Sequence, residues 1–172
     1  TTLYRFCSQE ECTDGALPIG RLTTAADGSL YGVSSAGGGS CPPDSGGCGV
    51  IFKIVPNGEG SAETVLHAFC TKPDCEDGHA PRAGLLLDAT GNLYGTTWFG
   101  GGNDIDVNGL GGGVAFKLSG STFKVIHSFC ALPDCADGEY PLAPFAMDES
   151  GKLFGTSSRG GAFENDTFGG TL

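Results

Sequence analysis

The stretch His67-Ala-Phe-Cys-Thr-Lys-Pro-Asp-Cys-Glu-Asp-Gly78, followed by Pro81 and by Gly91-Asn-Leu-Tyr-Gly-Thr-Thr97, decides the fold because it occurs three times. Its first cysteine, Cys70, is matched by Cys7, 63 residues earlier, and by Cys130, 60 residues later. The other landmarks keep these offsets. A fixed period of this size is the signature of a repeat architecture. We therefore divide the chain into three repeats, at residues 1–62, 63–122 and 123–172.

Each repeat contains four short segments with strand character. In the second repeat they are expected at residues 63–69, 83–87, 92–97 and 113–118. The first of them alternates, with Val65, His67 and Phe69 on one face. Asp88-Ala-Thr-Gly91 reads as a tight hairpin, with Gly91 at the position that needs a positive φ. Helical periodicity is absent, so the sequence predicts an all-β fold.

Four antiparallel strands joined by tight turns and repeated in tandem are typical of propeller blades. A β-solenoid is the alternative, although solenoid coils are usually shorter than this repeat. The predicted fold is therefore β-propeller-like, with three tandem four-stranded antiparallel blades of about 60 residues.

The phase of the repeat suggests how two copies meet. Thr1–Phe6 is an expected strand without a sheet before it, and Gly169–Leu172 matches only the start of the strand at 113–118. Three blades are also fewer than a closed propeller normally has. Either the sequence belongs to a longer array, or the free strand pairs head-to-tail with the unfinished sheet of another copy, in a ring or a filament. The residues expected at this contact are Thr2, Leu3, Tyr4, Arg5, Phe6, Gly170, Thr171 and Leu172.

The cysteines predict four local disulfides. Three copies of one Cys-x4-Cys unit argue for pairing inside each unit, which leaves the remaining two cysteines for each other. Zinc is the competing interpretation, but zinc sites gather four ligands, and these pairs lie on separate repeats. Disulfides indicate an oxidising, extracellular compartment. The expected pairs are Cys7 with Cys12, Cys41 with Cys48, Cys70 with Cys75, and Cys130 with Cys135.

Charge and composition exclude several classes of partner. The net charge is −11, from 20 acidic and nine basic residues without a basic cluster, so the chain would repel nucleic acid. No apolar run approaches the ~20 residues of a membrane span. The motifs of serine hydrolases, zinc proteases and phosphate-binding loops are missing, and the glycine clusters lack a following helix. We therefore predict that the protein is not an enzyme.

One motif predicts a metal site. Asp104-Ile-Asp106-Val-Asn108-Gly109 supplies oxygen ligands at positions one, three and five of a calcium loop, with glycine at position six. The closing glutamate is missing, because Ala115 stands in its place. Asp104, Asp106 and Asn108 are the candidate calcium ligands, and a polar surface loop is the alternative.

Three recurring acids follow the cysteine units, and Asp-Gly is first of all a turn signal, with a repeated metal site as the alternative. A histidine recurs at one strand position, where the first repeat has Tyr4; this exchange favours a structural role. Two further acids are expected to cap hairpins. The acids of the turns are Asp14, Asp77 and Asp137, the histidines are His67 and His127, and the hairpin acids are Asp88 and Asp148.

An aromatic pair, Trp98-Phe99, interrupts the Ser-Ser or Thr-Thr pattern beside a glycine-rich loop. Such a pair could stack on a sugar ring or anchor an interface. Packing within the protein is the alternative use.

The run of Asp-Gly-x-x-Pro, Gly-Asn-Leu-Tyr-Gly-Thr-Thr and Val-x-Phe-Lys-Leu resembles the GloVer tandem repeat of secreted or surface-anchored bacterial proteins. The resemblance covers nearly the whole chain and implies a propeller-like, extracellular, non-catalytic array. The sequence departs from it by inserting cysteine pairs before Asp-Gly. We expect a structural protein that self-assembles head-to-tail by strand complementation, with other copies as partners and calcium as an accessory. The alternative is a carbohydrate- or surface-binding module that uses Trp98, with polysaccharide as the partner.

Overall fold

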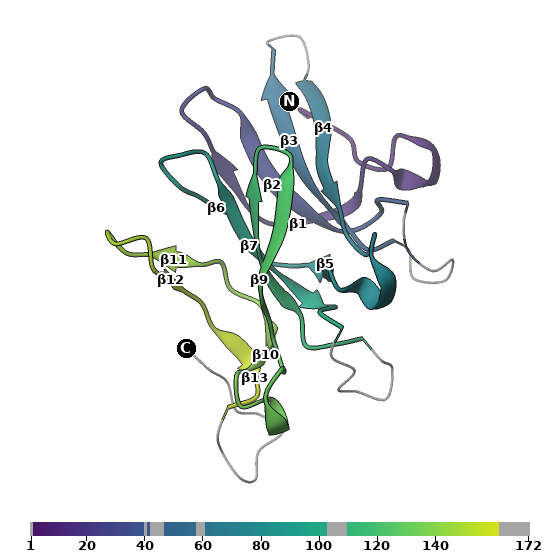
Figure 1. The fold of residues 1–172 in the computed structure, drawn as a ribbon. Helices are drawn as coiled ribbons and strands as arrows, with labels where there is room; N and C mark the ends of the chain where they lie inside the picture. The colour runs from purple at the N-terminus through teal and green to yellow at the C-terminus, as the bar shows by residue number, and fades with distance from the viewer. Residues whose placement is uncertain (1, 40, 42–46, 58–60, 103–109, 162–172) are drawn as a thin grey trace.

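The computed structural model describes residues 2–39, 41, 47–57, 61–102 and 110–161 (Figure 1). The strands are β1 (Ala16–Thr24), β2 (Leu30–Ala36), β3 (Val50–Pro56), β4 (Ser61–Ala68), β5 (His79–Pro81), β6 (Leu86–Leu87), β7 (Leu93–Phe99), β8 (Val114–Ser119), β9 (Thr122–Ser128), β10 (Glu139–Pro141), β11 (Ala146–Met147), β12 (Leu153–Phe154) and β13 (Ser157–Arg159). Single 3-10 turns follow the first cysteine of each repeated unit, at η1 (Glu10–Cys12), η2 (Pro73–Cys75) and η3 (Pro133–Cys135). Across the described ranges, no helix has the length and apolar character needed to cross a membrane.

The strands form antiparallel sheets that follow one another along the chain. Sheet 1 has the order β1-β2-β3-β4, and sheet 2 has the order β5-β7-β8-β9, with β6 also paired to β7. The third unit, called sheet 3 here, consists of the ladders β10–β13 and β11–β12. Figure 1 shows sheets 1 and 3 on opposite sides of sheet 2. The all-β prediction is confirmed, while the described strands do not close into a ring.

The last strand of sheet 1 and the last strand of sheet 2 each open the next sequence repeat. β4 pairs with β3 and completes sheet 1, although most of it belongs to the second repeat. β9 pairs with β8 and completes sheet 2 in the same way. The sheets are therefore one strand out of phase with the sequence repeats. This offset ties neighbouring repeats together through backbone hydrogen bonds.

The amino-terminal segment, expected as a strand, does not form one over residues 2–6. Its equivalent in the next repeat pairs with β3, whereas no described strand forms a ladder with residues 2–6. The segment is held by side chains instead. Tyr4 and Phe6 pack on the sheet 1 cluster of Val50, Phe52 and Ile54, with the rings of Phe6 and Phe52 4.7 Å apart. Apolar packing therefore replaces backbone pairing here. The other expected contact residues, Gly170, Thr171 and Leu172, lie outside the described residues.

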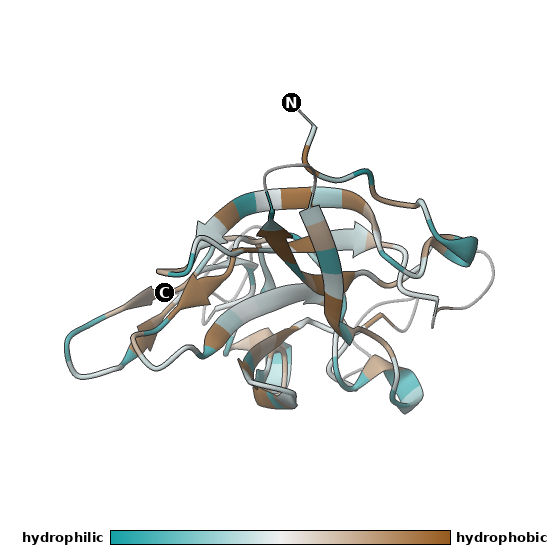
Figure 2. Ribbon diagram, turned by 90° about the horizontal axis from the view of Figure 1, so that it is seen from above, coloured by the Kyte–Doolittle hydropathy of each residue, from teal (hydrophilic) through white to brown (hydrophobic). Residues whose placement is uncertain are grey.

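The main core lies between sheets 1 and 2. Val33 and Ile51 from sheet 1 meet Leu85 and Phe116 from sheet 2, and Phe69 joins them after β4. Hydrophobic and hydrophilic residues alternate along some of the strands (Figure 2), whereas the consecutive apolar residues of β3 serve both faces of sheet 1, with Ile51 in this core and Phe52 in the other cluster. Sheets 1 and 2 are thus stacked units that share a core.

The segment before β6 departs from the strand expected at 83–87, because only Leu86 and Leu87 pair there. A methyl group on Gly84 would lie 2.9 Å from the carbonyl oxygen of Arg21 in β1. This close approach to the neighbouring sheet displaces the backbone from the line of a regular strand.

In the second and third repeats, the residue before the recurring proline bonds to the preceding repeat. Ala80 and Tyr140 both have positive φ angles, of 51° and 55°. The N–H of Ala80 donates to Cys48 O at 2.9 Å, and that of Tyr140 donates to Gly112 O at 2.8 Å. A positive φ is costly for these residues. The bond between repeats offsets this cost.

Glu63 stands where sheet 2 has a phenylalanine. Glu63 pairs with Ile54 in sheet 1 as Phe123 pairs with Leu118 in sheet 2. Phe123 stacks on His67 with ring centres 3.7 Å apart, whereas Glu63 Oε1 is buried without a hydrogen-bond partner. Burial, with a smaller contribution from Asp14, raises the pKa of Glu63 to about 7. The carboxylate is therefore disfavoured in the folded state.

We expect Glu63→Phe to raise the free energy of unfolding by about 1–2 kcal/mol at pH 8, because it removes this charge and adds apolar burial. Since the folded pKa lies above the unfolded value of 4.5, the cost of Glu63 grows as pH rises from about 4.5 through 7. The gain should therefore be smaller at pH 4.5. Urea unfolding at the two pH values measures it, with Thr64→Phe as an exposed control. An equal gain at both would contradict the role of the charge.

Candidate functional site

The predicted calcium ligands Asp104, Asp106 and Asn108 lie outside the described residues. The structure therefore leaves the calcium loop as a prediction.

All eight cysteines form the expected local disulfides. The sequence had placed these pairs apart, but the structure brings two of them together: the sulfur of Cys48 lies within 4.8 Å of those of Cys70 and Cys75. His79 lies as close to the sulfurs of Cys41 and Cys48. Because every cysteine is bonded, this grouping is two adjacent disulfides beside an imidazole.

The repeated Asp-Gly acids hold the cysteine loops in place. The buried carboxylate of Asp77 accepts hydrogen bonds from Thr71 N at 3.1 Å, Thr71 Oγ1 at 2.7 Å and Lys72 N at 3.3 Å. Asp14 accepts equivalent bonds from Ser8, and Asp137 accepts them from two backbone N–H groups of its loop. The turn interpretation therefore accounts for these acids.

The recurring histidine position faces the same acids. His67 Nε2 lies 3.4 Å from Asp77 Oδ2, and His127 Nε2 lies 3.4 Å from Asp137 Oδ2. In the first repeat the hydroxyl of Tyr4 donates to Asp14 at 2.9 Å. A tyrosine and a histidine thus serve the same carboxylate, which agrees with a structural role.

The hairpin acids cap their turns as expected. Asp88 accepts hydrogen bonds from Thr90 N and Asn92 N, both at 2.9 Å. Burial raises the pKa of Asp88, but the hydrogen bonds from the side chains and backbone of Asn92 and Thr90 outweigh it and lower the pKa. Asp148 accepts bonds from Ser150 N and Lys152 N, also at 2.9 Å. These acids stabilise the turn between two strands.

The aromatic pair forms a cluster at the junction of β7 and β10. The rings of Trp98 and Phe99 are stacked 4.6 Å apart, and Tyr140 meets both edge-on. A shallow pocket of about 280 Å³ opens beside them. The guanidinium of Arg82 lies 3.2 Å from the centre of the Trp98 ring and covers one of its faces.

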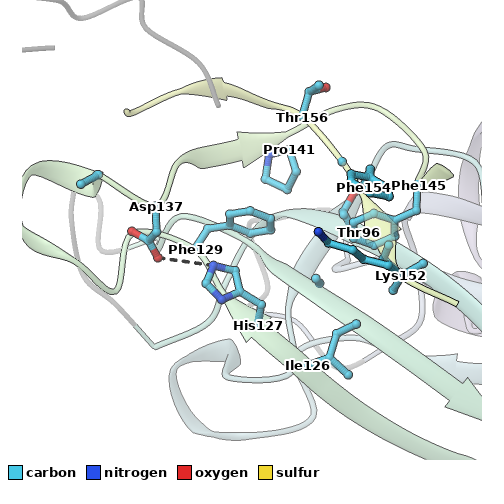
Figure 3. Close-up of a pocket in the computed structure, with 14 residues that line it drawn as sticks. Thr96, Ile126, His127, Phe129, Asp137, Pro141, Phe145, Lys152, Phe154 and Thr156 are labelled. Carbon is cyan, nitrogen blue, oxygen red and sulfur yellow. Dashed lines mark ion pairs between the residues drawn. The ribbon is translucent and has the colours of Figure 1, made fainter. Parts of the chain in front are cut away.

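The larger candidate site is an apolar pocket of about 620 Å³ between sheet 2 and sheet 3 (Figure 3). Its walls include Thr96 and Ile126 from sheet 2 and Phe145, Phe154 and Gly155 from sheet 3. Ile126 is 41 % exposed and Phe154 is 40 % exposed. Figure 3 shows His127 pointing toward Asp137 at one end, with Phe145 and Phe154 gathered at the other. The pocket offers apolar contact along a strand edge.

The same place in the other sheets is filled by a phenylalanine of the third strand. A methyl group on Gly32 would lie 2.5 Å from Cζ of Phe52, and one on Gly95 would lie 2.6 Å from Cζ of Phe116. At the matching residue, Gly155, the three nearest atoms all belong to Phe145, at 2.7, 2.8 and 3.8 Å. The pocket is therefore the position that a third-strand ring occupies in sheets 1 and 2.

The residues around Gly155 are correspondingly more open than those of sheet 2. Leu93 and Thr96 are buried, whereas their equivalents Leu153 and Thr156 are half-buried and exposed. Among the described strands, β12 pairs only with β11. The sequence alone did not single out this pocket. The available signal was Gly155, because it recurs at the repeat position of Gly32 and Gly95, which phenylalanine rings cover.

The family model described as the Gloeobacter/Verrucomicrobia repeat matches residues 1–169 of the chain. A search of curated proteins found no significant match.

Proposed function

Because the chain belongs to the Gloeobacter/Verrucomicrobia repeat family, we propose that it is a non-catalytic, extracellular structural protein whose propeller-like repeats associate head-to-tail by strand complementation. Four disulfides support the extracellular location, since such bonds persist in oxidising compartments. Calcium in the loop at Asp104 is proposed as an accessory.

The backbone of β1 carries the proposal. Leu17 has a φ of 54°, which matches Ala80 and Tyr140, the residues that bond to the repeat before them. A positive φ is energetically costly, and at Ala80 and Tyr140 it accompanies the hydrogen bond to the repeat before. The same backbone conformation at Leu17 therefore suits β1 to an equivalent contact. Leu17 is 69 % exposed, and Leu22 on the same strand is 45 % exposed. Sheet 1 therefore offers one half of the contact between repeats.

The other half lies at the opposite side of the molecule. Sheet 3 presents the exposed residues Leu142 and Phe154 and the edge of β12 that no described strand pairs with. Two different surfaces that complement each other give a heterologous contact, which produces rings or filaments. The contact made between successive repeats within the chain would then also join separate copies.

Sedimentation velocity across a concentration series tests the proposal. We expect the average mass to rise above that of the monomer, and we expect Leu17→Asp to shift the population toward monomer by placing a charge in the contact. Leu132→Asp, at a residue that is 54 % exposed in the η3 loop, is the matched control and should still associate. A wild-type chain that stays monomeric at every concentration would contradict association between copies.

A carbohydrate-binding module is the second candidate, and the stack of Trp98 and Phe99 beside a pocket favours it. Aromatic faces bind sugar rings, but Arg82 already covers one face of the indole. Glycan binding by the monomer that is lost in Trp98→Ala would support this function instead.

A further inference from the structure

We propose that Cys48 is a site of thiol–disulfide exchange, at which an external thiol converts the bond between Cys41 and Cys48 into a bond between repeats, from Cys48 to Cys70. The local pairs are the resting state of the chain. The exchange takes a low-molecular-weight thiol as its co-reactant. It goes beyond the proposed association of copies and does not depend on it.

Cys48 lies where two neighbouring disulfides meet. It is 1 % exposed and belongs to the core between sheets 1 and 2, and the other three cysteines of the two pairs pack against this core. The sulfurs of Cys48, Cys70 and Cys75 all lie within 4.8 Å of one another. A thiolate held this close to a disulfide exchanges with it inside the molecule, where its effective concentration far exceeds that of a thiol in solution.

The next repeat shows how the backbone sets this approach. Gly112 is the equivalent of Cys48, because the carbonyl oxygen of each accepts a hydrogen bond from the residue before the recurring proline. A methyl group on Gly112 would lie 2.9 Å from Cβ of Cys130, which is the equivalent of Cys70. The two Cβ atoms of a disulfide are about 3.5–4.5 Å apart. A side chain at this position therefore points at the first cysteine of the following unit, and a small shift gives the pair disulfide geometry.

The order of the steps follows from burial. Cys41 is half-buried, so an external thiolate reaches its sulfur first, forms a mixed disulfide there and releases Cys48 as a thiolate. The Cys48 sulfur then attacks the sulfur of Cys70, and the electron pair of the broken bond leaves on Cys75. Cys75 takes up the proton that the external thiol gave up. The numbers of disulfides and of thiols are unchanged, so no oxidant is consumed.

The new bond joins sheet 1 to sheet 2. It closes the loop of residues 48–70, which is longer than the loop of residues 41–48, and longer loops restrict the unfolded chain more in the chain-entropy model. Because Cys48 is buried, the new bond is also shielded from further external thiols. A thiol that opens the accessible side of the cluster thus replaces a local cross-link with a link between repeats.

The Cys41→Ser chain tests the exchange, because it leaves Cys48 without its partner and needs no added thiol. Free thiols of the folded chain are trapped with N-ethylmaleimide, and linked peptides are identified by mass spectrometry. Trypsin leaves Cys70 and Cys75 on one peptide, and a protease that cuts before Asp74 separates them. We expect N-ethylmaleimide on Cys75 as well as on Cys48. We expect the link from Cys48 to Cys70 in at least about one tenth of the chains, because exchange between similar disulfides leaves both forms populated.

Cys135→Ser is the matched control. It frees Cys130, which belongs to no group of three close sulfurs among the described residues and faces Gly112 instead of a cysteine. N-ethylmaleimide should therefore mark Cys130 alone, and the other three disulfides should stay as they are.

The wild-type chain treated with reduced glutathione gives a second measurement, which decides the matter if circular dichroism shows that Cys41→Ser does not fold. We expect glutathione on Cys41 together with the link from Cys48 to Cys70. N-ethylmaleimide on Cys48 without a linked peptide would overturn the proposal. Links from Cys48 to the cysteines of the first and third repeated units, as frequent as the link to Cys70, would also overturn it, because they indicate random exchange.

Discussion

Replacing Phe116 by alanine should lower the free energy of unfolding by about 3–5 kcal/mol, the usual cost of removing a buried phenylalanine. The ring is fully buried and lies 5.4 Å from the ring of Phe69 and 5.3 Å from that of Phe123. It also lies against Gly95, whose missing side chain leaves the surroundings little means of filling the cavity. Total stabilities of such domains are about 5–15 kcal/mol, so the loss should be severe.

Phe154→Ala is the matched control for Phe116→Ala. Its ring is 40 % exposed, so its removal should cost less than about 1 kcal/mol. Chemical denaturation of both variants, with circular dichroism as the signal, measures the difference. If both variants lost a similar free energy of unfolding, the ring of Phe116 would not hold the shared core together.

Replacing Asp77 by alanine should have the second largest effect, a loss of about 3 kcal/mol, because it leaves buried donors without their acceptor. The carboxylate is fully buried and serves both Thr71 and Lys72. Burial alone would raise the pKa of Asp77, but His67 and the bonds from Thr71 and Lys72 outweigh it and lower the pKa to about 2. The cysteine loop should therefore loosen when this charge is removed.

The same pKa predicts a pH dependence. The folded pKa lies below the unfolded value of 3.8, so the stabilisation is fully present above about pH 4 and is lost as pH falls through 2. Its size is about 2 kcal/mol. Urea unfolding of wild type and Asp77→Asn between pH 6 and pH 2 measures it. The difference between them should shrink over the acid part of this range, and a constant difference would contradict the assignment.

Asp137→Ala is a control for Asp77→Ala. Asp137 is partly exposed and accepts bonds from the backbone of Ala131 and Leu132, without a hydroxyl donor. Its removal should cost clearly less than that of Asp77. If both variants lost the same free energy of unfolding, the burial of Asp77 and its bond from the Thr71 hydroxyl would add nothing to stability.

Much of the fold could be predicted from the sequence, because its signals are local. The strand at residues 63–69 and the hairpin at Asp88–Gly91 depend on neighbouring residues only, and both occur in the structure. The single face predicted for Val65, His67 and Phe69 is wrong, because a register shift pairs Val65 with Phe52 but His67 with Ile51 and so turns them to opposite faces. The cysteine pairs were also accessible, since three copies of one short unit leave few sensible pairings. The role of Asp88 as a turn cap follows from the same local chemistry.

Features that depend on contacts between repeats could not be predicted in this way. The segment at Tyr4 and Phe6 has strand-forming residues, yet it packs through its rings and forms no ladder with any described strand. The proximity of Cys48 to Cys70 depends on how sheet 2 sits on sheet 1. The pocket at Gly155 is visible only once the register shows which side chain covers the matching glycines.

The short span of the disulfides has a consequence for how such chains arise. Three bonds join cysteines five positions apart and one joins cysteines seven positions apart, so no bond reaches from one repeat to another. Each covalent link can close as soon as its own few residues reach an oxidising compartment. Gene duplication or deletion of a whole unit therefore leaves every thiol with its original mate, and the array can lengthen or shorten during evolution without scrambled oxidation.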